Sequence, residues 1–134
     1  MLDVLGIDEA QAGPAPEPQN FTGRVRMQNL AAAGGTAELE LLAVFFDAGA
    51  HTRPHIHPTD QVLFFVRGSG FVAFPGEGEQ RVAESGIVVV PAGLVHMHGA
   101  TDAEPVCHVA LRAPGPTDWD PPLPDEWRQY GRAE

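Results

Sequence analysis

Short apolar runs separated by glycine and other turn residues fill the middle of the chain. The runs are rich in Val and Phe and turns follow at short intervals, which is typical of a sandwich or barrel of strands. The expected strands are Phe21–Met27, Ala37–Phe46, His55–His57, Gln61–Arg67, Phe71–Phe74, Glu79–Ala83, Ile87–Val90, Val95–His98 and Val106–Leu111. No part of this region repeats its apolar residues with the α-helical period of about 3.6 residues. The pattern therefore predicts an all-β fold.

Proline-rich segments flank this region on both sides. Because proline favours extended and turn conformations, we expect extended N- and C-terminal arms, residues 1–19 and 113–134, around a single barrel of residues 20–112. The second arm carries Trp119 and Trp127, whose large apolar rings are expected to dock it on the barrel or on a neighbouring subunit. The arm also holds the single helical candidate, a short segment near its end.

Length and composition narrow the class of protein. The chain has 134 residues, which is enough for one domain with one hydrophobic core. Hydrophobic residues make up 43% and charged residues 19%, a balance typical of globular rather than disordered proteins. The formal net charge of -10 disfavours binding to nucleic acid or to an anionic membrane. We therefore expect neither a nucleic-acid nor a membrane partner.

Several chemistries are excluded by residues that the chain lacks. All 8 basic residues are arginine, so no lysine can form a Schiff base or act as a general base. The single cysteine, Cys107, excludes an internal disulfide and a thiolate zinc site. The first residues lack the basic start and long apolar run of a secretory signal, and no apolar run approaches the ~20 residues of a membrane helix. A cytoplasmic protein is expected.

All 6 histidines lie in the predicted barrel and none in the arms. They are His51, His55, His57, His96, His98 and His108. Four of them form two His-x-His pairs, and residues two apart on a strand project from the same face. Inward positions of separate barrel strands converge on one interior volume. An isolated pair is most often two solvated side chains, but two pairs beside Pro/Gly turns favour a shared divalent cation.

The spacing around the first pair resembles the first motif of the cupin superfamily. Gly49, His55, His57, Gln61 and Gly68 have the separations of that motif, with Gln61 in place of the usual Glu. The second motif is matched by Pro91-x-Gly93-x-x-His96. The resemblance implies a jelly-roll, or double-stranded β-helix, barrel. It also implies a metal site whose ligands are His55, His57, Gln61 and His96.

A narrower resemblance covers about residues 21–130. The segments 55–61, 91–101 and 108–110 are similar to the small single-domain cupins associated with carboxymuconolactone decarboxylases and to the bacterial metal-dependent cupin hydroxynitrile lyases. This similarity implies that His98 and His108 line the cavity. The chain departs from the subgroup at Met97, where Trp is frequent, and at Arg53-Pro54 ahead of the first ligand.

The implied ligand set has chemical consequences. Three neutral imidazoles and an amide leave a divalent ion its full double charge, so the site is a stronger Lewis acid than one with Glu at position 61. Nitrogen and oxygen ligands without thiolate suit Mn, Fe, Co, Ni or Zn. A histidine that is not a ligand can take a proton from a substrate nearby, so His98 and His108 are the candidate catalytic residues. The alternative is that they orient a ligand or only pack.

Three functions fit these residues. The first is a metal-dependent small-molecule enzyme with hydroxynitrile-lyase-like cleavage of a carbon–carbon bond or a related proton transfer. The second is a non-haem iron dioxygenase that uses a three-His site after Gln61 is displaced. The third is a non-catalytic, metal-containing cupin that binds a ligand. Cupins commonly pair exposed edge strands across a two-fold axis, so the resemblance implies a homo-oligomer, a dimer or higher.

Overall fold

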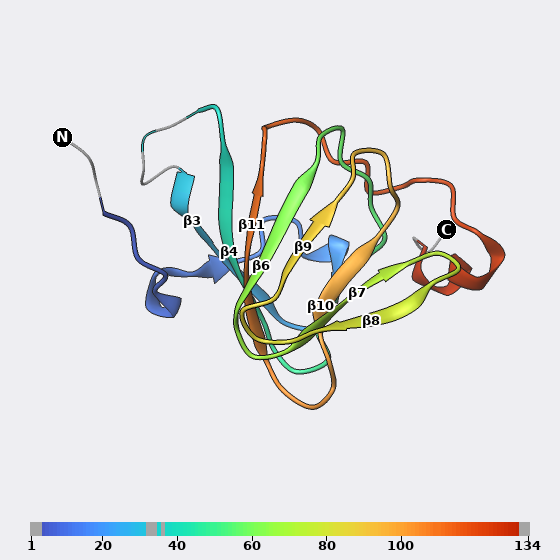
Figure 1. Cartoon of the computed structure of the whole chain (residues 1–134), viewed down its shortest axis with the longest axis horizontal. Helices are drawn as coiled ribbons and strands as arrows, with labels where there is room; N and C mark the ends of the chain where they lie inside the picture. The colour runs from blue at the N-terminus through green and yellow to red at the C-terminus, as the bar shows by residue number, and fades with distance from the viewer. Residues whose placement is uncertain (1–3, 32–34, 36, 132–134) are drawn as a thin grey trace.

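Two antiparallel sheets make up the computed structural model, which describes residues 4–31, 35 and 37–131 (Figure 1). The first sheet has the order β1 (Gly13–Pro14), β3 (Val25–Asn29), β4 (Glu40–Phe46), β11 (Val106–Arg112), β6 (Gln61–Arg67) and β9 (Ile87–Val90). The second has the order β2 (Phe21–Thr22), β5 (His51–Thr52), β10 (Met97–Ala100), β7 (Gly70–Phe74) and β8 (Gly78–Val82). The 3-10 turns η1 (Glu9–Gln11), η2 (Pro18–Asn20) and η3 (Asp125–Tyr130) lie outside the sheets. The predicted all-β fold is confirmed.

The sheets are not closed into the barrel that the sequence predicted. Within the described residues each strand pairs only inside its own sheet. The expected strand His55–His57 is replaced by two isolated bridges, from His55 to His96 and from Ile56 to Asp118. Pro54 and Pro58 flank this segment and have no N–H to donate, so neither can continue a ladder of backbone hydrogen bonds.

The expected strand Phe21–Met27 is also interrupted, because it contributes to both sheets. Its first two residues form β2 in the second sheet, and β3 begins at Val25 in the first. Gly23 lies between them with φ +79°, a left-handed conformation that favours glycine. A Cβ on Gly23 would lie 2.8 Å from the Cβ of Ala50, so the close approach of the two segments also requires glycine.

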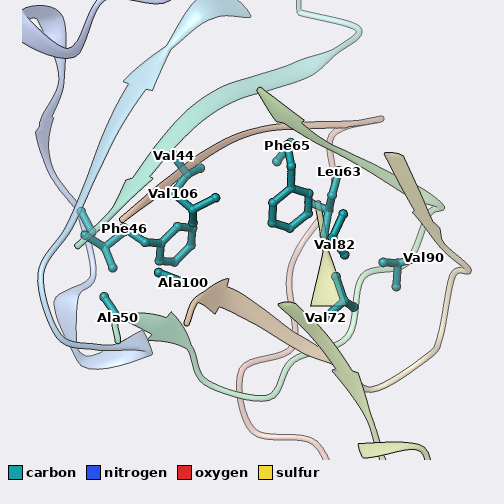
Figure 2. Packing of buried hydrophobic residues seen from close by; sticks show 13 residues of the cluster. Val44, Phe46, Ala50, Leu63, Phe65, Val72, Val82, Val90, Ala100 and Val106 are labelled. Atoms are coloured by element: carbon teal, nitrogen blue, oxygen red, sulfur yellow. The ribbon is translucent and has the colours of Figure 1, made fainter. Parts of the chain in front are cut away.

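The main core lies between the sheets, as Figure 2 shows. Phe46 and Phe65 extend from the first sheet and are 1% and 0% exposed, and Val72 and Val82 extend from the second. Full burial of each such side chain contributes about 1.5–3 kcal/mol. This packing holds the two sheets face to face and so fixes the positions of the strands that carry the histidines.

Parts of both arms pack on the outer faces of the sheets, with Ile7 and Ala12 of the N-terminal arm against the first sheet. Trp127 of η3 is buried against Phe71, Ala73 and Met97 of the second sheet, as the sequence predicted for the C-terminal arm. On the first sheet, Cys107 faces outward into a smaller apolar cluster, and burial raises the pKa of its thiol to about 11. Among the described residues, no helix is long and apolar enough to span a membrane.

A β-bulge lies where β11 pairs with β6. Cys107 is opposite Arg67 but His108 is opposite Phe65, so Val66 is an extra residue in the ladder. Bulges bend a strand and re-aim neighbouring side chains. Here Phe65 and His108 both point into the core, where their ring centroids lie 5.3 Å apart.

Candidate metal centre

Five histidines from different segments meet in the interior. They are His55, His57, His96, His98 and His108, and none is more than 6% exposed. The ring centroids of His55 and His96 lie 4.3 Å apart, and those of His55 and His57 lie 4.8 Å apart. The backbone bridge between His55 and His96 accounts for this proximity. The convergence of the two His-x-His pairs, predicted from their spacing, is therefore present.

Hydrogen bonds to backbone carbonyls orient two of these rings. Nδ1 of His55 lies 2.7 Å from the carbonyl oxygen of Arg53, and Nδ1 of His96 lies 2.9 Å from that of Leu94. A carbonyl oxygen only accepts, so in each ring Nδ1 carries the hydrogen and Nε2 keeps its lone pair. The Nε2 atoms are thereby available as metal ligands.

Four buried atoms around this point have no hydrogen-bond partner in the described part of the chain. They are Nε2 of His57, His96 and His98, and Oε1 of Gln61. Unpaired buried polar atoms are uncommon and costly. A divalent cation is the usual partner for such lone pairs, so these residues fit a metal ion.

One group of imidazoles that could hold a metal includes His98. One nitrogen from each of His55, His96 and His98 lies within 4.8 Å of the others, so these three could hold a metal. His57 and Gln61 are buried beside this group with unpaired acceptor atoms. His98, predicted only as a catalytic cavity residue, is therefore also a candidate ligand.

Burial keeps all five rings uncharged at neutral pH. Loss of solvation lowers the pKa of His57 to about 3, and those of His96 and His108 to about 4. Burial, followed by repulsion from neighbouring imidazoles, holds the pKa values of His55 and His98 well below 6.5. Metal ligands must be neutral imidazoles, and burial supplies that state.

The metal-free protein is expected to lose stability in mild acid for the same reason. Below pH 6.5 the unfolded chain binds protons on histidines that remain neutral in the native state. Each such histidine lowers the free energy of unfolding by up to ~1.4 kcal/mol per pH unit until its native pKa is reached. Urea unfolding of chelator-treated protein at constant ionic strength should show a clearly lower midpoint at pH 5 than at pH 7.5. Equal midpoints would contradict the burial of neutral rings.

His98 and His108 form a hydrogen-bonded pair at the wall of the cavity. Nε2 of His108 lies 2.9 Å from Nδ1 of His98, so one hydrogen is shared between the two rings. His108 is packed against the rings of Phe46 and Phe65, and the backbone N–H of His98 donates to Oγ1 of Thr52. Both histidines therefore have fixed orientations.

The cluster opens on a small, mostly apolar cavity of about 80 Å³. Its apolar walls are Phe21, Met27, Leu42, Val44, Phe46, Ala110 and Trp119. The ring of Trp119 stacks on His55 with centroids 4.4 Å apart, and Phe21 lies 5.7 Å from Trp119. The C-terminal arm and strand β2 thus help to enclose the site. Sequence reasoning anticipated that Trp119 would dock the arm, but not that it would contact a candidate ligand.

The comparisons with known proteins identify the family. The family model for cupins matches residues 12–127. The chain belongs to the cupin family. Membership of this family, which the two motifs predicted, is thereby confirmed.

Individual relatives extend this result. This cupin is 32% identical to the (R)-mandelonitrile lyase of Granulicella tundricola, over 98% of this chain and 100% of that protein. It is 29% identical to a cupin-like protein of Thermotoga maritima, with a TM-score of 0.69, over 85% of this chain and 90% of that chain. A polyketide cyclase of Streptomyces resistomycificus superposes with a TM-score of 0.70, over 87% of this chain and 84% of that chain. The two sequences are 15% identical, so this similarity supports the fold alone.

Proposed function

We propose that this cupin is a metal-dependent enzyme that cleaves a carbon–carbon bond next to a hydroxyl group, as a hydroxynitrile lyase does. The observation that carries the proposal is the buried histidine cluster with unpaired lone pairs, beside a small apolar cavity. The relationship to a mandelonitrile lyase over nearly the whole chain supports the same type of reaction.

His55, His57, Gln61 and His96 would hold one divalent transition metal, and the lone pair on Nε2 of His98 stays available to the substrate. When bound, such an ion supplies Lewis acidity, which lowers the pKa of a nearby hydroxyl and attracts small anions. The nitrogen and oxygen ligand set without thiolate suits Mn, Fe, Co, Ni or Zn.

The remaining groups of the site bind the substrate and move the proton. The apolar walls exclude water and hold the apolar part of a small substrate. Nε2 of His98 accepts the hydroxyl proton, and the hydrogen on Nδ1 passes to Nε2 of His108 at 2.9 Å. The carbon–carbon bond then breaks as the carbonyl forms, and the leaving carbanion, such as cyanide, recovers the proton. The positive charge thus lies transiently on His108, farther from the candidate metal ligands.

A non-haem iron dioxygenase is the second candidate. It is favoured by the group of three imidazoles, His55, His96 and His98, whose nitrogens lie within 4.8 Å of one another. Three protein ligands would leave more coordination positions for oxygen and substrate than four.

Metal analysis followed by assays distinguishes the candidates. Purified protein is analysed for bound metal, reloaded with each candidate ion, and assayed on mandelonitrile and on catechol or dione substrates under air and under nitrogen. The expected result is stoichiometric metal and oxygen-independent cleavage of mandelonitrile. Turnover that requires oxygen would replace the lyase by the dioxygenase. Stoichiometric metal without turnover of any substrate would indicate a ligand-binding cupin.

Gln61→Glu is expected to retain or tighten metal binding and to weaken the binding of small anions by roughly tenfold or more. The reason is that a carboxylate removes one unit of positive charge from the site, and a unit charge about 4 Å away is worth about 4 kcal/mol at an effective dielectric constant of 20. Azide titration of the metal-loaded protein measures the effect. Gln80→Glu, which makes the same charge change at an exposed position of β8, is the control. Tighter azide binding in Gln61→Glu would contradict the charge argument.

The homo-oligomer expected from the sequence and the cytoplasmic location stay predictions. Strand β9 supports the former, because it is an edge strand whose Ile87 and Val89 are 62% and 60% exposed. Such an apolar edge favours pairing with a second copy. Light scattering of the purified protein measures the mass of the particle.

A further inference from the structure

A hydrogen-bonded chain connects His57 to a buried arginine. Nδ1 of His57 lies 3.1 Å from Oγ1 of Thr117, and Nη2 of Arg112 donates to the same oxygen at 3.1 Å. The same Nη2 is paired with the Glu40 carboxylate at 3.0 Å, and Nη1 donates to the carbonyl of Gly115 at 3.0 Å. One guanidinium thus joins β11, β4 and the C-terminal arm behind a candidate metal ligand.

Strand pairing fixes the place of Arg112. It is the last residue of β11, opposite Glu40 on β4 and Gln61 on β6, and it is only 7% exposed. A guanidinium is planar and always charged, with donors in a fixed fork, so it can hold several acceptors in one arrangement. A shorter or more flexible donor could not hold Gly115 and Thr117 together in the same way.

Backbone pairing fixes the place of Thr117. Ile56 donates to the carbonyl of Asp118 at 3.0 Å, and Asp118 donates to that of Ile56 at 2.9 Å. The arm therefore runs antiparallel to the segment 55–57, with Thr117 beside His57 and Trp119 beside His55. Two residues of the arm, two positions apart, thus contact two candidate ligands.

The hydroxyl of Thr117 suits the tautomer that a metal ligand needs. His57 can offer Nε2 to a cation only when Nδ1 carries the hydrogen, and that hydrogen needs an acceptor. Oγ1 of Thr117 has two lone pairs, of which one accepts from Arg112 and the other can accept from His57. For His55 and His96 a backbone carbonyl has this role. For His57 it falls to a side chain of the arm.

We propose that Thr117 and Arg112 are positioning residues for His57, in which Thr117 accepts the Nδ1 hydrogen and Arg112 holds the Thr117 hydroxyl in place. The inference rests on the proposed function, because it requires a metal at His57.

Thr117→Val tests the contact directly, because valine keeps the shape and removes the hydroxyl. Metal affinity should fall by about 10–100-fold, the usual cost of losing such a partner. The affinity is measured by calorimetric titration of Mn²⁺ into chelator-treated protein. The Mn²⁺ paramagnetic resonance spectrum should change as well, which a purely structural role would not cause. Thr117→Ser, which restores the hydroxyl, should recover both the affinity and the spectrum.

Two further variants separate this contact from docking of the arm as a whole. Oγ1 of Thr59 donates to the carbonyl of Ala113 in the same arm and, within the described residues, forms no hydrogen bond to a histidine, so Thr59→Val should bind Mn²⁺ like the wild type. Arg112→Lys keeps the charge and loses the fork, and should weaken binding. The double variant of Arg112→Lys and Thr117→Val should bind Mn²⁺ about as weakly as Thr117→Val alone, because the two residues act through one contact.

Each outcome bears on a different claim. Wild-type protein that binds no metal would overturn both the proposed function and this inference. If Thr117→Val binds Mn²⁺ as tightly as the wild type does, the inference is overturned and the proposed function still stands. An equal loss in Thr59→Val would assign the effect to arm docking and overturn the role of Thr117, and fully additive losses would overturn the role of Arg112.

Discussion

Replacing His96 with alanine is expected to leave the purified protein without stoichiometric metal. His96 is fully buried, and its ring centroid lies 4.3 Å from that of His55 and 5.3 Å from that of His57. Removing it takes away one imidazole and leaves a cavity at the centre of the ligand set. Metal content per chain, measured by mass spectrometry after purification with the candidate ion, should fall from stoichiometric to background.

His55→Ala should give the same loss, because His55 bridges His96 through the backbone and contributes to the same compact group. His51→Ala is the matched control. The His51 ring lies against Phe71 and Tyr130, outside the cluster, so this variant should keep its metal. Full occupancy in both the His55 and the His96 variants would show that the ion is not bound here.

Replacing His108 with alanine is expected to lower turnover by roughly 10²–10⁴-fold while metal remains bound. The loss follows if the proton leaves the substrate through the 2.9 Å contact between His98 and His108. His98→Ala should lose activity similarly and also retain metal. Metal content of each variant and steady-state rates on mandelonitrile measure the two effects.

The pH dependence of turnover should also reflect the role of these histidines as proton acceptors. The neutral ring is the proton acceptor, and burial lowers the pKa of His108 to about 4. Activity should therefore persist below pH 6.5 and fall only as the pH drops through that lowered value. Cys107→Ala, the neighbouring position that faces outward, should keep its rate. Unchanged activity in both single variants and the double variant would exclude the two histidines as bases, and loss of metal in His98→Ala would make His98 a ligand.

Much of the sheet structure could be predicted from local patterns. The bounds of β6, Gln61–Arg67, and of β9, Ile87–Val90, agree with the expected strands, because dense Val and Phe end there at turn residues. Strands β1 and β5 have two residues each, too few for an alternating pattern, and they exist only through pairing with distant segments. The interruption at Gly23 depends on the close approach of Ala50, which the local sequence does not reveal.

The candidate site, like the fold, could be predicted from the sequence only in part. The convergence of His55, His57 and His96 was predicted from motif spacing and strand parity, and it is present although His55–His57 forms bridges and not a strand. The contacts of Thr117 and Trp119 could not follow, because they depend on the pairing of Asp118 with Ile56, and the proline-rich arm has no periodicity from which to infer a register. The buried pairing of Arg112 with Glu40 likewise requires the register of β11 on β4.

The pairing of β11 with β4 and β6 also has a kinetic consequence. Val106 is opposite Phe46 and Arg112 is opposite Glu40, so the strand that carries His108 pairs with residues far back in the chain. Long-range pairing is slow to form, and folding dominated by it takes milliseconds to seconds. The cluster is therefore complete only when nearly the whole chain has folded, and an unfolded chain offers a cation no more than separate His-x-His pairs. An ion that binds only the complete cluster stabilises the native state and not the transition state for folding. It therefore slows unfolding and leaves the rate of folding nearly unchanged.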